Sequence, residues 1–246
     1  MPKPPTKIRL DQLLVQRGLA ESREKAKALI MAGLAQVDGT RADKAGRLVP
    51  ASASVLLKGT QPYVSRGGQK LEAGIRHFDV EVKDKILIDV GASTGGFTDC
   101  LLQNGAQKVI AVDVGYGQLD WKLRQDPRVA VLEKTNIRYL KPEDLDAPIH
   151  GATIDVSFIS LKLVVPPVSD LLEKQAFIMA LIKPQFEVGK GQVGKGGVVR
   201  DPNLHQEVID QLRTFFETLG WTVQGHIPSP LLGPKGNREF LIYLTR

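Results

Sequence analysis

A glycine-rich segment between two apolar runs holds the residues whose types and spacing could bind a cofactor. Ile86 to Val90 is short and rich in β-branched residues, which predicts a strand buried on both faces of a parallel sheet. It leads into the segment Gly91 to Phe97, whose glycines allow a sharp turn and a close approach of the backbone to a ligand. A second apolar run, Val109 to Val112, ends at Asp113, at the spacing where a carboxylate accepts hydrogen bonds from ribose hydroxyls. The pattern predicts a site for a nucleoside cofactor.

The glycine spacing indicates which cofactor would bind. A dinucleotide fingerprint requires G-x-G-x-x-G, so that amides at a helix N-terminus hold a pyrophosphate, and this segment lacks that spacing. It reads D-x-G-x-S-x-G from Asp89, and an acidic residue before the loop suits a cationic or zwitterionic ligand better than a diphosphate. S-adenosylmethionine has a sulfonium, an ammonium and an adenosine but no phosphate, so it is the predicted cofactor. A glycine-rich turn that binds no ligand is the alternative.

Two polar residues follow later predicted strands. Asn136 comes after the run Val129 to Leu132 and could hydrogen-bond an adenine edge. Asp155 lies near the carboxyl end of the run Ala152 to Val156, which is where ligands bind in open α/β sheets. The predicted cofactor contacts are Asp89, Gly91, Ala92, Ser93, Thr94, Gly95, Gly96, Phe97, Asp113, Val114, Asn136 and Asp155.

The elements that must position these residues alternate between strands and helices from residue 69 to residue 246. This alternation predicts an α/β fold with a doubly wound, mostly parallel, seven-stranded Rossmann-like sheet. Its last two strands, 221–224 and 240–244, are expected to pair antiparallel. Pro166 and Pro167 interrupt one helical pattern, 163–172, and predict that its first turn starts there.

Positive charge is concentrated in the first quarter of the chain. Residues 1–60 contain 11 Lys or Arg and 5 Asp or Glu, whereas the rest of the chain contains 22 of each, so the formal net charge of +6 resides in this part. The asymmetry indicates a polyanion-binding module attached to a neutral catalytic body. The solvated surface of a small domain is the alternative.

Two short helices and a hairpin are predicted in this basic part. The first helix ends at Gly18, the second has Ser22 as its N-cap, and Asp38-Gly39 predicts the hairpin turn. From Arg9 to Lys58 the segment resembles the alpha-L RNA-binding module first known from a small-subunit ribosomal protein. The resemblance implies contacts with RNA phosphates, which give affinity and register but little sequence information. We therefore assign residues 1–60 to a small α+β RNA-binding domain, 61–68 to a linker and 69–246 to the second domain.

The predicted RNA contacts are basic residues of both parts. They are Arg9, Arg23, Lys25, Lys27, Arg47, Arg66, Lys190 and Lys195. The last two lie in the stretch 189–197, which has the spacing of a phosphate-binding loop. Gly196 replaces the Ser or Thr that must reach magnesium, so we interpret this stretch as a flexible lid or an RNA-facing loop.

Four charged residues fall where the predicted elements could present them to the cofactor: Lys70, Asp155, Lys183 and Glu239. Each alone is a residue type common on surfaces and in ion pairs. Together with their surroundings they resemble the hemolysin A (TlyA) family of ribosomal RNA 2'-O-methyltransferases, whose bodies are FtsJ-like. The resemblance covers nearly the whole chain and is carried by the motifs SRGGQKL, DVGASTGGFTD, DVSFISL, LIKPQFE and NREFL. It implies that these four residues form the family's catalytic Lys-Asp-Lys-Glu tetrad and that the substrate is a cytidine of ribosomal RNA.

The tetrad suits methyl transfer to a ribose. A 2'-hydroxyl is a poor nucleophile at neutral pH, so a nearby group must accept or steer its proton while its oxygen attacks the methyl group. Lys183 is the predicted residue, because a lysine can do this if burial or a second cation, here Lys70, lowers its pKa. Asp155 and Glu239 are expected to orient the two ammonium groups.

Other classes of protein and site fit the composition less well. No apolar stretch approaches the roughly 20 residues that span a bilayer and no signal peptide is evident, so we expect a cytoplasmic protein without a membrane partner. Cys100 falls among apolar helix positions and is interpreted as a core residue, and the histidines lack ligand spacing, so no metal is expected. Two alternatives remain: an RNA-binding assembly factor with a silent methyltransferase body, and a pore-forming cytolysin.

Overall fold

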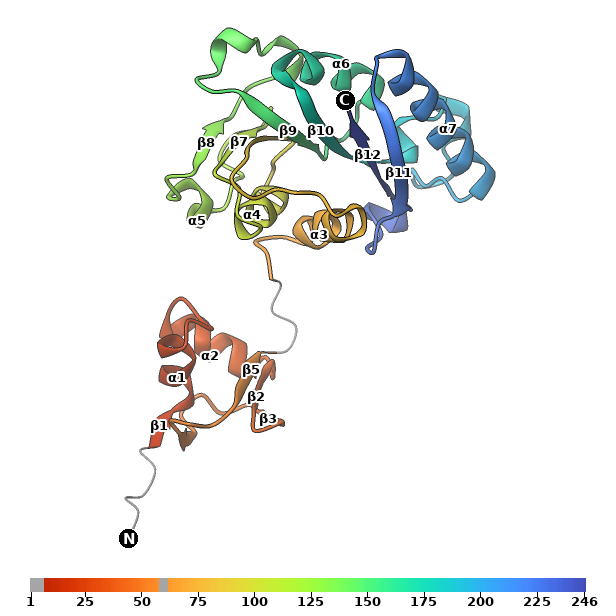
Figure 1. Cartoon of the computed structure of the whole chain (residues 1–246). Coiled ribbons are helices and arrows are strands. Elements are labelled where there is room, and N and C mark those ends of the chain that lie inside the picture. The colour runs from red at the N-terminus through yellow and green to blue at the C-terminus, as the bar shows by residue number, and fades with distance from the viewer. Residues whose placement is uncertain (1–6, 58–61) are drawn as a thin grey trace. The chain divides into compact units, whose positions relative to one another are not determined.

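The structure, a computed structural model, describes residues 7–57 and 62–246 (Figure 1). The chain divides into two compact units, Met1–Gln61 and Pro62–Arg246. Each unit has its own hydrophobic core. In the described part of the chain, no helix combines the length and the apolarity needed to span a bilayer.

The first unit is a small α+β domain, as predicted. It contains β1 (Lys7–Arg9), α1 (Leu10–Gln16), α2 (Arg23–Met31), β2 (Ala35–Val37), β3 (Thr40–Ala42), β4 (Leu48–Pro50) and β5 (Val55–Leu57). β2 lies between β3 and β5, and β1 pairs with β4. Two local predictions are confirmed: the Ser22 side chain accepts a hydrogen bond from the amide of Lys25, and Asp38 and Gly39 both have positive φ in the β2–β3 hairpin.

The second unit contains a seven-stranded sheet in the order β11-β12-β10-β9-β6-β7-β8. Its strands are β6 (Ile86–Val90), β7 (Lys108–Val112), β8 (Val129–Leu132), β9 (Ile149–Ile154), β10 (Leu172–Ile182), β11 (Thr222–Pro228) and β12 (Phe240–Thr245). The five strands from β10 to β8 are parallel, and β12 runs antiparallel to both of its neighbours. The predicted fold class is confirmed, including the antiparallel pair at the end of the chain.

Helices cover both faces of this sheet. They are α3 (Gly67–Phe78), α4 (Gly96–Gln103), α5 (Trp121–Arg124), α6 (Leu161–Leu171) and α7 (Pro202–Thr218), with single 3-10 turns at Ile137–Tyr139, Pro142–Asp144, Pro184–Phe186, Lys190–Gln192 and Pro234–Gly236. One core joins α3, α4 and α5 to one face, and the other joins α6 and α7 to the opposite face (Figure 1). Cys100 is buried in the first of these cores, as predicted. Residues at or just after the carboxyl ends of β6, β7, β9 and β10 line the candidate site.

The start of α6 differs from the prediction. The helix begins at Leu161, with the Ser160 hydroxyl accepting from the amide of Lys162, and both Pro166 and Pro167 lie inside it. A proline at an interior position removes a backbone hydrogen bond. The helix persists because its apolar face, including Val165 and Val168, is fully buried against the sheet.

The segment before α3 also differs from the prediction. We assigned residues 61–68 to a linker, of which Gln61 lies outside the described residues, but the rest packs within the second unit. Tyr63 is buried in the α3–α4 core, and the amide of Val64 donates to Asp99 Oδ2 at 2.9 Å. Gln103 Nε2 donates to the carbonyl of Pro62 at 2.9 Å. The proline and glycine content of this segment indicated a domain boundary. Tyr63 and Val64, however, attach the segment to α4.

Candidate active site

The glycine loop after β6 is held close to the neighbouring strands. The amides of Gly91 and Ala92 both donate to the carbonyl of Val112, at 2.9 and 3.1 Å. Gly91 has φ +83°, and a Cβ there would lie 2.7 Å from the carbonyl oxygen of Asp155. Only glycine satisfies both the backbone angle and the lack of space. The loop therefore lies directly against the segment that carries Asp155.

Asp89 precedes this loop and lines neither of the cavities described below, so the cofactor contact predicted for it stays a prediction. Its side chain is fully buried, and it accepts hydrogen bonds from Thr98 Oγ1 at 2.6 Å and Thr153 Oγ1 at 3.0 Å. Burial raises the pKa of Asp89 to about 6, and the two hydroxyls oppose that shift. The carboxylate connects β6 to α4 and β9, because the two threonines come from those elements. Its role is to anchor the loop.

One cavity, here named the Asp113 cavity, opens beside the carboxyl ends of β6 and β7 and has a volume of about 480 Å³. Asp113 lines it, while Oδ2 accepts from the amide of Ser93 at 2.8 Å and Oδ1 from the amide of Gly115 at 2.7 Å. Asn136 lines it too, with Oδ1 capping the turn that follows and accepting from the amide of Arg138. The apolar side chains at this cavity are Val90, Val112, Val114, Ile137, Val156, Phe158, Ile159 and Val164.

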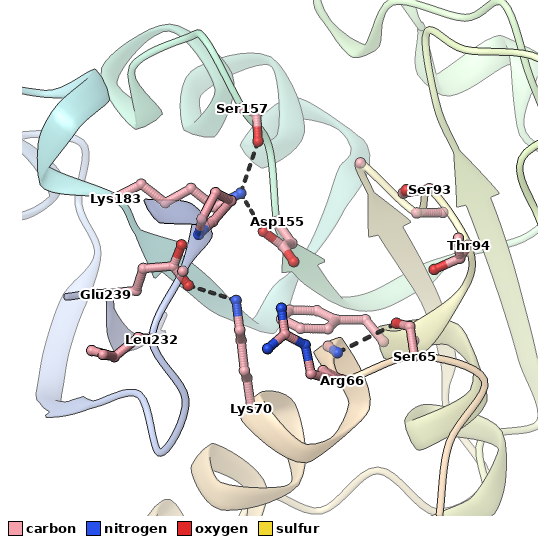
Figure 2. A pocket seen from close by; sticks show the side chains of 17 residues that line it. Ser65, Arg66, Lys70, Ser93, Thr94, Asp155, Ser157, Lys183, Leu232 and Glu239 are labelled. Carbon is pink, nitrogen blue, oxygen red and sulfur yellow. Dashed lines mark hydrogen bonds and ion pairs between the residues drawn. The ribbon is translucent and has the colours of Figure 1, made fainter. Parts of the chain in front are cut away.

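A second cavity, here named the lysine cavity, has a volume of about 300 Å³ and contains all four charged residues of the predicted tetrad (Figure 2). Lys70 Nζ, from α3, lies 2.5 Å from Glu239 Oε2, just before β12. Lys183 Nζ, at the end of β10, lies 2.6 Å from Asp155 Oδ1 and donates to Ser157 Oγ at 3.0 Å. The contact with Asp155 is an ion pair whose angles fall outside those of a hydrogen bond. The structure thus brings together four residues that are separated by up to 169 positions.

The two ion pairs are buried to different degrees. The Glu239 side chain is 0% exposed and that of Lys70 is 12% exposed, whereas the Asp155 side chain is 23% exposed. Glu239 Oε1 lies against Gly233, where a Cβ would be 2.0 Å away, and among the described residues it has no hydrogen-bond partner. A buried carboxylate oxygen without a donor is unusual in a folded protein. Of the two ion pairs, the contact between Lys70 and Glu239 is the better shielded from solvent.

The two cavities adjoin each other, because Gly91, Ser93, Asp155 and Ser157 line both of them. Of the other predicted cofactor contacts, Asp113, Val114 and Asn136 line the Asp113 cavity, and Ala92, Thr94, Gly96 and Phe97 line the lysine cavity. Gly95 lines neither. It has φ +92° at the N-cap of α4, and a Cβ there would clash with Leu123, so its role is conformational.

Several lining residues were missed by sequence reasoning. Ser157 follows Asp155 by two positions within the motif DVSFISL, and that proximity was the available signal. The turn Leu232-Gly233-Pro234 closes the lysine cavity beside Glu239, and it gave no signal beyond turn composition. Ser65, Gln118 and Thr135 were also missed.

The predicted RNA contacts occupy three different environments. Arg9 and Arg23 form ion pairs with Asp11, at 2.8 and 3.4 Å, and the hydrogen bond from Arg9 holds the pKa of this 0% exposed carboxyl below its usual value. Lys25, Lys27, Arg47 and Lys195 are exposed. Arg66 lines the lysine cavity, beside the tetrad. The side chain of Lys190 lies outside the described residues.

Comparison with known proteins gives independent information on both units. The FtsJ-like methyltransferase family matches residues 63–246, and the S4 domain matches residues 8–55. The chain is 53% identical to "Putative rRNA methyltransferase YqxC" of Bacillus subtilis, over 97% of this chain and 85% of that protein. It is 46% identical to "16S/23S rRNA (cytidine-2'-O)-methyltransferase TlyA" of Mycobacterium tuberculosis, over 97% of this chain and 90% of that protein.

A solved structure resembles the whole chain. The protein described as "Putative hemolysin from Streptococcus thermophilus" is 47% identical, with a TM-score of 0.75, over 98% of this chain and 89% of that chain. The likeness therefore extends through both units.

Proposed function

The chain belongs to the hemolysin A (TlyA) family, with an S4 domain and an FtsJ-like methyltransferase domain, and from this premise we propose that it transfers a methyl group from S-adenosylmethionine to a ribose 2'-hydroxyl of ribosomal RNA. The observation that carries the proposal is the pair of lysine–carboxylate contacts in a cavity continuous with the glycine loop. The name of the M. tuberculosis relative supports a cytidine as the target nucleotide.

The Asp113 cavity has the features that this cofactor requires. When bound, S-adenosylmethionine supplies an electrophilic methyl group on a sulfonium. Asp113 would hold the ribose hydroxyls, since its carboxylate lies at the carboxyl end of β7 and lines the cavity. Apolar side chains such as Ile137 and Ile159 would cover the adenine. Gly91 lines both cavities and has no side chain that would project between them.

The lysine cavity would hold the target ribose. Lys183 Nζ is held by an ion pair with Asp155 and a hydrogen bond to Ser157 Oγ, and both of these residues line the two cavities. In this proposal Lys183 steers the proton of the 2'-hydroxyl. Lys70 and Glu239 also line this cavity, where the buried Glu239 carboxylate would hold the Lys70 ammonium toward the substrate. In this proposal the four residues align the 2'-hydroxyl for attack and direct its proton away from the attacking oxygen, which is the role expected of the predicted tetrad.

The first unit would bring the RNA. Its exposed basic residues include Lys25 and Lys27 of α2 and Arg47 before β4. Lysine and arginine contacts to phosphates supply affinity without choosing a base. Since the proposed substrate is ribosomal RNA, we expect the protein to act in the cytoplasm.

Methyl transfer can be tested directly. The protein is incubated with tritiated S-adenosylmethionine and separated 30S and 50S ribosomal subunits, and the modified nucleotide is mapped by mass spectrometry. Label at a cytidine ribose supports the proposal. Binding of subunits without label would instead support an RNA-binding assembly factor, and leakage of dye-loaded liposomes without label would support a cytolysin.

A further inference from the structure

A third cavity, here named the arginine pocket, lies next to the lysine cavity in the second unit. It has a volume of about 230 Å³, and Arg200, Lys235, Arg238 and His205 supply its polar side chains. The two cavities share one chain segment, because Pro234 and Glu239 line the lysine cavity while their sequence neighbours Lys235 and Arg238 line the arginine pocket. Adjacent Cα atoms are about 3.8 Å apart, so the backbone that borders this pocket is one residue away from the backbone that borders the lysine cavity.

The three cations of the pocket lack acidic partners. Within residues 7–57 and 62–246, no carboxylate oxygen lies within 4.0 Å of Arg200, Lys235 or Arg238, whereas Arg124 and Arg128 of the same unit both form such pairs. The acid that follows Arg200, Asp201, caps α7 and accepts from the amide of Asn203. Three positive charges around one small cavity repel each other, and an anion between them would relieve that repulsion.

The frame of the pocket is held by buried hydrogen bonds. Asn237, 3% exposed, accepts from the amide of Val199 at 3.1 Å and donates to the carbonyl of Gly197 at 2.9 Å, which joins the segment before α7 to the segment before β12. His205, 5% exposed, contacts the carbonyl of Val199 through Nε2 at 2.9 Å, and that nitrogen must donate because a carbonyl only accepts. The three exposed cations therefore project from a backbone that is held in place, so binding has to order only their side chains.

We propose that the arginine pocket binds a phosphodiester of the substrate RNA, next to the nucleotide whose ribose enters the lysine cavity. Two guanidinium groups and an ammonium match the oxygens of a phosphate, to which arginine donates in a bidentate manner. The choice of RNA over a free anion rests on the proposed function and on the chain segment that the arginine pocket shares with the lysine cavity. A nucleotide bound in the lysine cavity would bring its own neighbouring phosphates toward the arginine pocket. The contact sets the register of the strand and carries no base preference.

The test compares two triple variants of the full-length protein. Arg200→Gln/Lys235→Gln/Arg238→Gln removes the charges of the pocket. The matched control, Lys83→Gln/Lys108→Gln/Lys174→Gln, removes the same charge at the amino ends of β6, β7 and β10, far from the site. Binding to 50S and 30S subunits is measured by filter retention from 50 to 200 mM KCl at constant Mg²⁺, and cofactor affinity by calorimetry.

The expected result is a smaller salt dependence for the pocket variant alone. Each lost phosphate contact lowers the slope of log K against log salt by roughly 0.7, so three contacts lower it by about two. The advantage of the wild type over the pocket variant is then about 15-fold larger at 50 mM than at 200 mM KCl. The KM for RNA rises in the pocket variant, and its cofactor affinity stays equal to that of the control.

Other outcomes would overturn the proposal or separate it from the proposed function. Equal slopes for wild type and pocket variant, or an equal loss in the control, exclude a specific phosphate contact. Calorimetric binding of inorganic phosphate to the wild type but not to the pocket variant, with unchanged RNA slopes, would identify a free anion as the ligand and overturn the RNA assignment. A lower slope in the pocket variant together with no methyl transfer by any form would support the pocket and refute the proposed reaction.

Discussion

The ion pair between Lys70 and Glu239 should contribute to both stability and activity, and substitution can separate the two effects. The change is Lys70→Met, which keeps the length of the side chain and removes its charge. The Glu239 side chain is 0% exposed, its Oε2 has Lys70 Nζ at 2.5 Å, and its Oε1 has no hydrogen-bond partner among the described residues. Lys70→Met therefore leaves the buried Glu239 carboxylate without its ion-pair partner.

The size of the effect follows from this burial. Removing one partner of a buried ion pair costs about 3–5 kcal/mol, because the remaining charge stays desolvated. For a domain of this size each 1 kcal/mol lowers Tm by roughly 2–4 °C. We expect the second unit of Lys70→Met to unfold roughly 6–20 °C below that of the wild type, as measured by near-UV circular dichroism.

The double variant Lys70→Met/Glu239→Gln is the matched control. It removes both charges at nearly constant volume, so most of the lost stability should return. Methyl transfer, measured with tritiated cofactor below the Tm of every variant, should stay at least 100-fold below wild type. An unchanged Tm in Lys70→Met, or near-normal turnover in the double variant, would refute the reasoning.

Three further predictions concern other parts of the site. Lys183→Met should lower single-turnover methylation by 10²-fold to 10⁴-fold while calorimetric cofactor affinity changes little; near-normal turnover would remove Lys183 from its proposed role. Gly91→Ala should cost about 1–3 kcal/mol in the free energy of unfolding and weaken cofactor binding, because its Cβ would lie 2.7 Å from the Asp155 carbonyl at φ +83°; full stability with full affinity would contradict this. Asp89→Asn should change the pH dependence of stability: the folded pKa of Asp89 is raised from 3.8 to about 6, so its ionisation destabilises the fold as pH rises through that interval. The difference in unfolding free energy between wild type and Asp89→Asn, from urea titrations, should then fall by about 3 kcal/mol from below pH 4 to above pH 6, and a pH-independent difference would show that the carboxyl is not desolvated.

Local features of the fold were predictable from the sequence. The strand before Gly91, the glycine loop, the hairpin at Asp38-Gly39 and the Ser22 cap depend on residues within a few positions of each other, through backbone preference and hydrophobic period. The same holds for the order of strands and helices, which predicted the doubly wound sheet. That the four tetrad residues form one set was predicted only through the family motifs, because no periodicity links Lys70 to Glu239.

Tertiary burial decided the remaining features. Which carboxylate pairs with which lysine depends on where β10 and β12 lie in the sheet. The hydrogen bonds of Asp89 to Thr98 and Thr153 likewise depend on helix α4 and strand β9, which pack around it. Burial also overrode the local signal at Pro166 and Pro167, where a packed helix face outweighs the missing hydrogen bonds. The tertiary structure likewise decided that Tyr63 packs on the second unit. The amino-acid sequence alone thus determined the helices and strands and the kind of chemistry. The tertiary structure decided the partners of each charged group, because the free energy of a charge depends on the burial and the neighbours that distant segments provide.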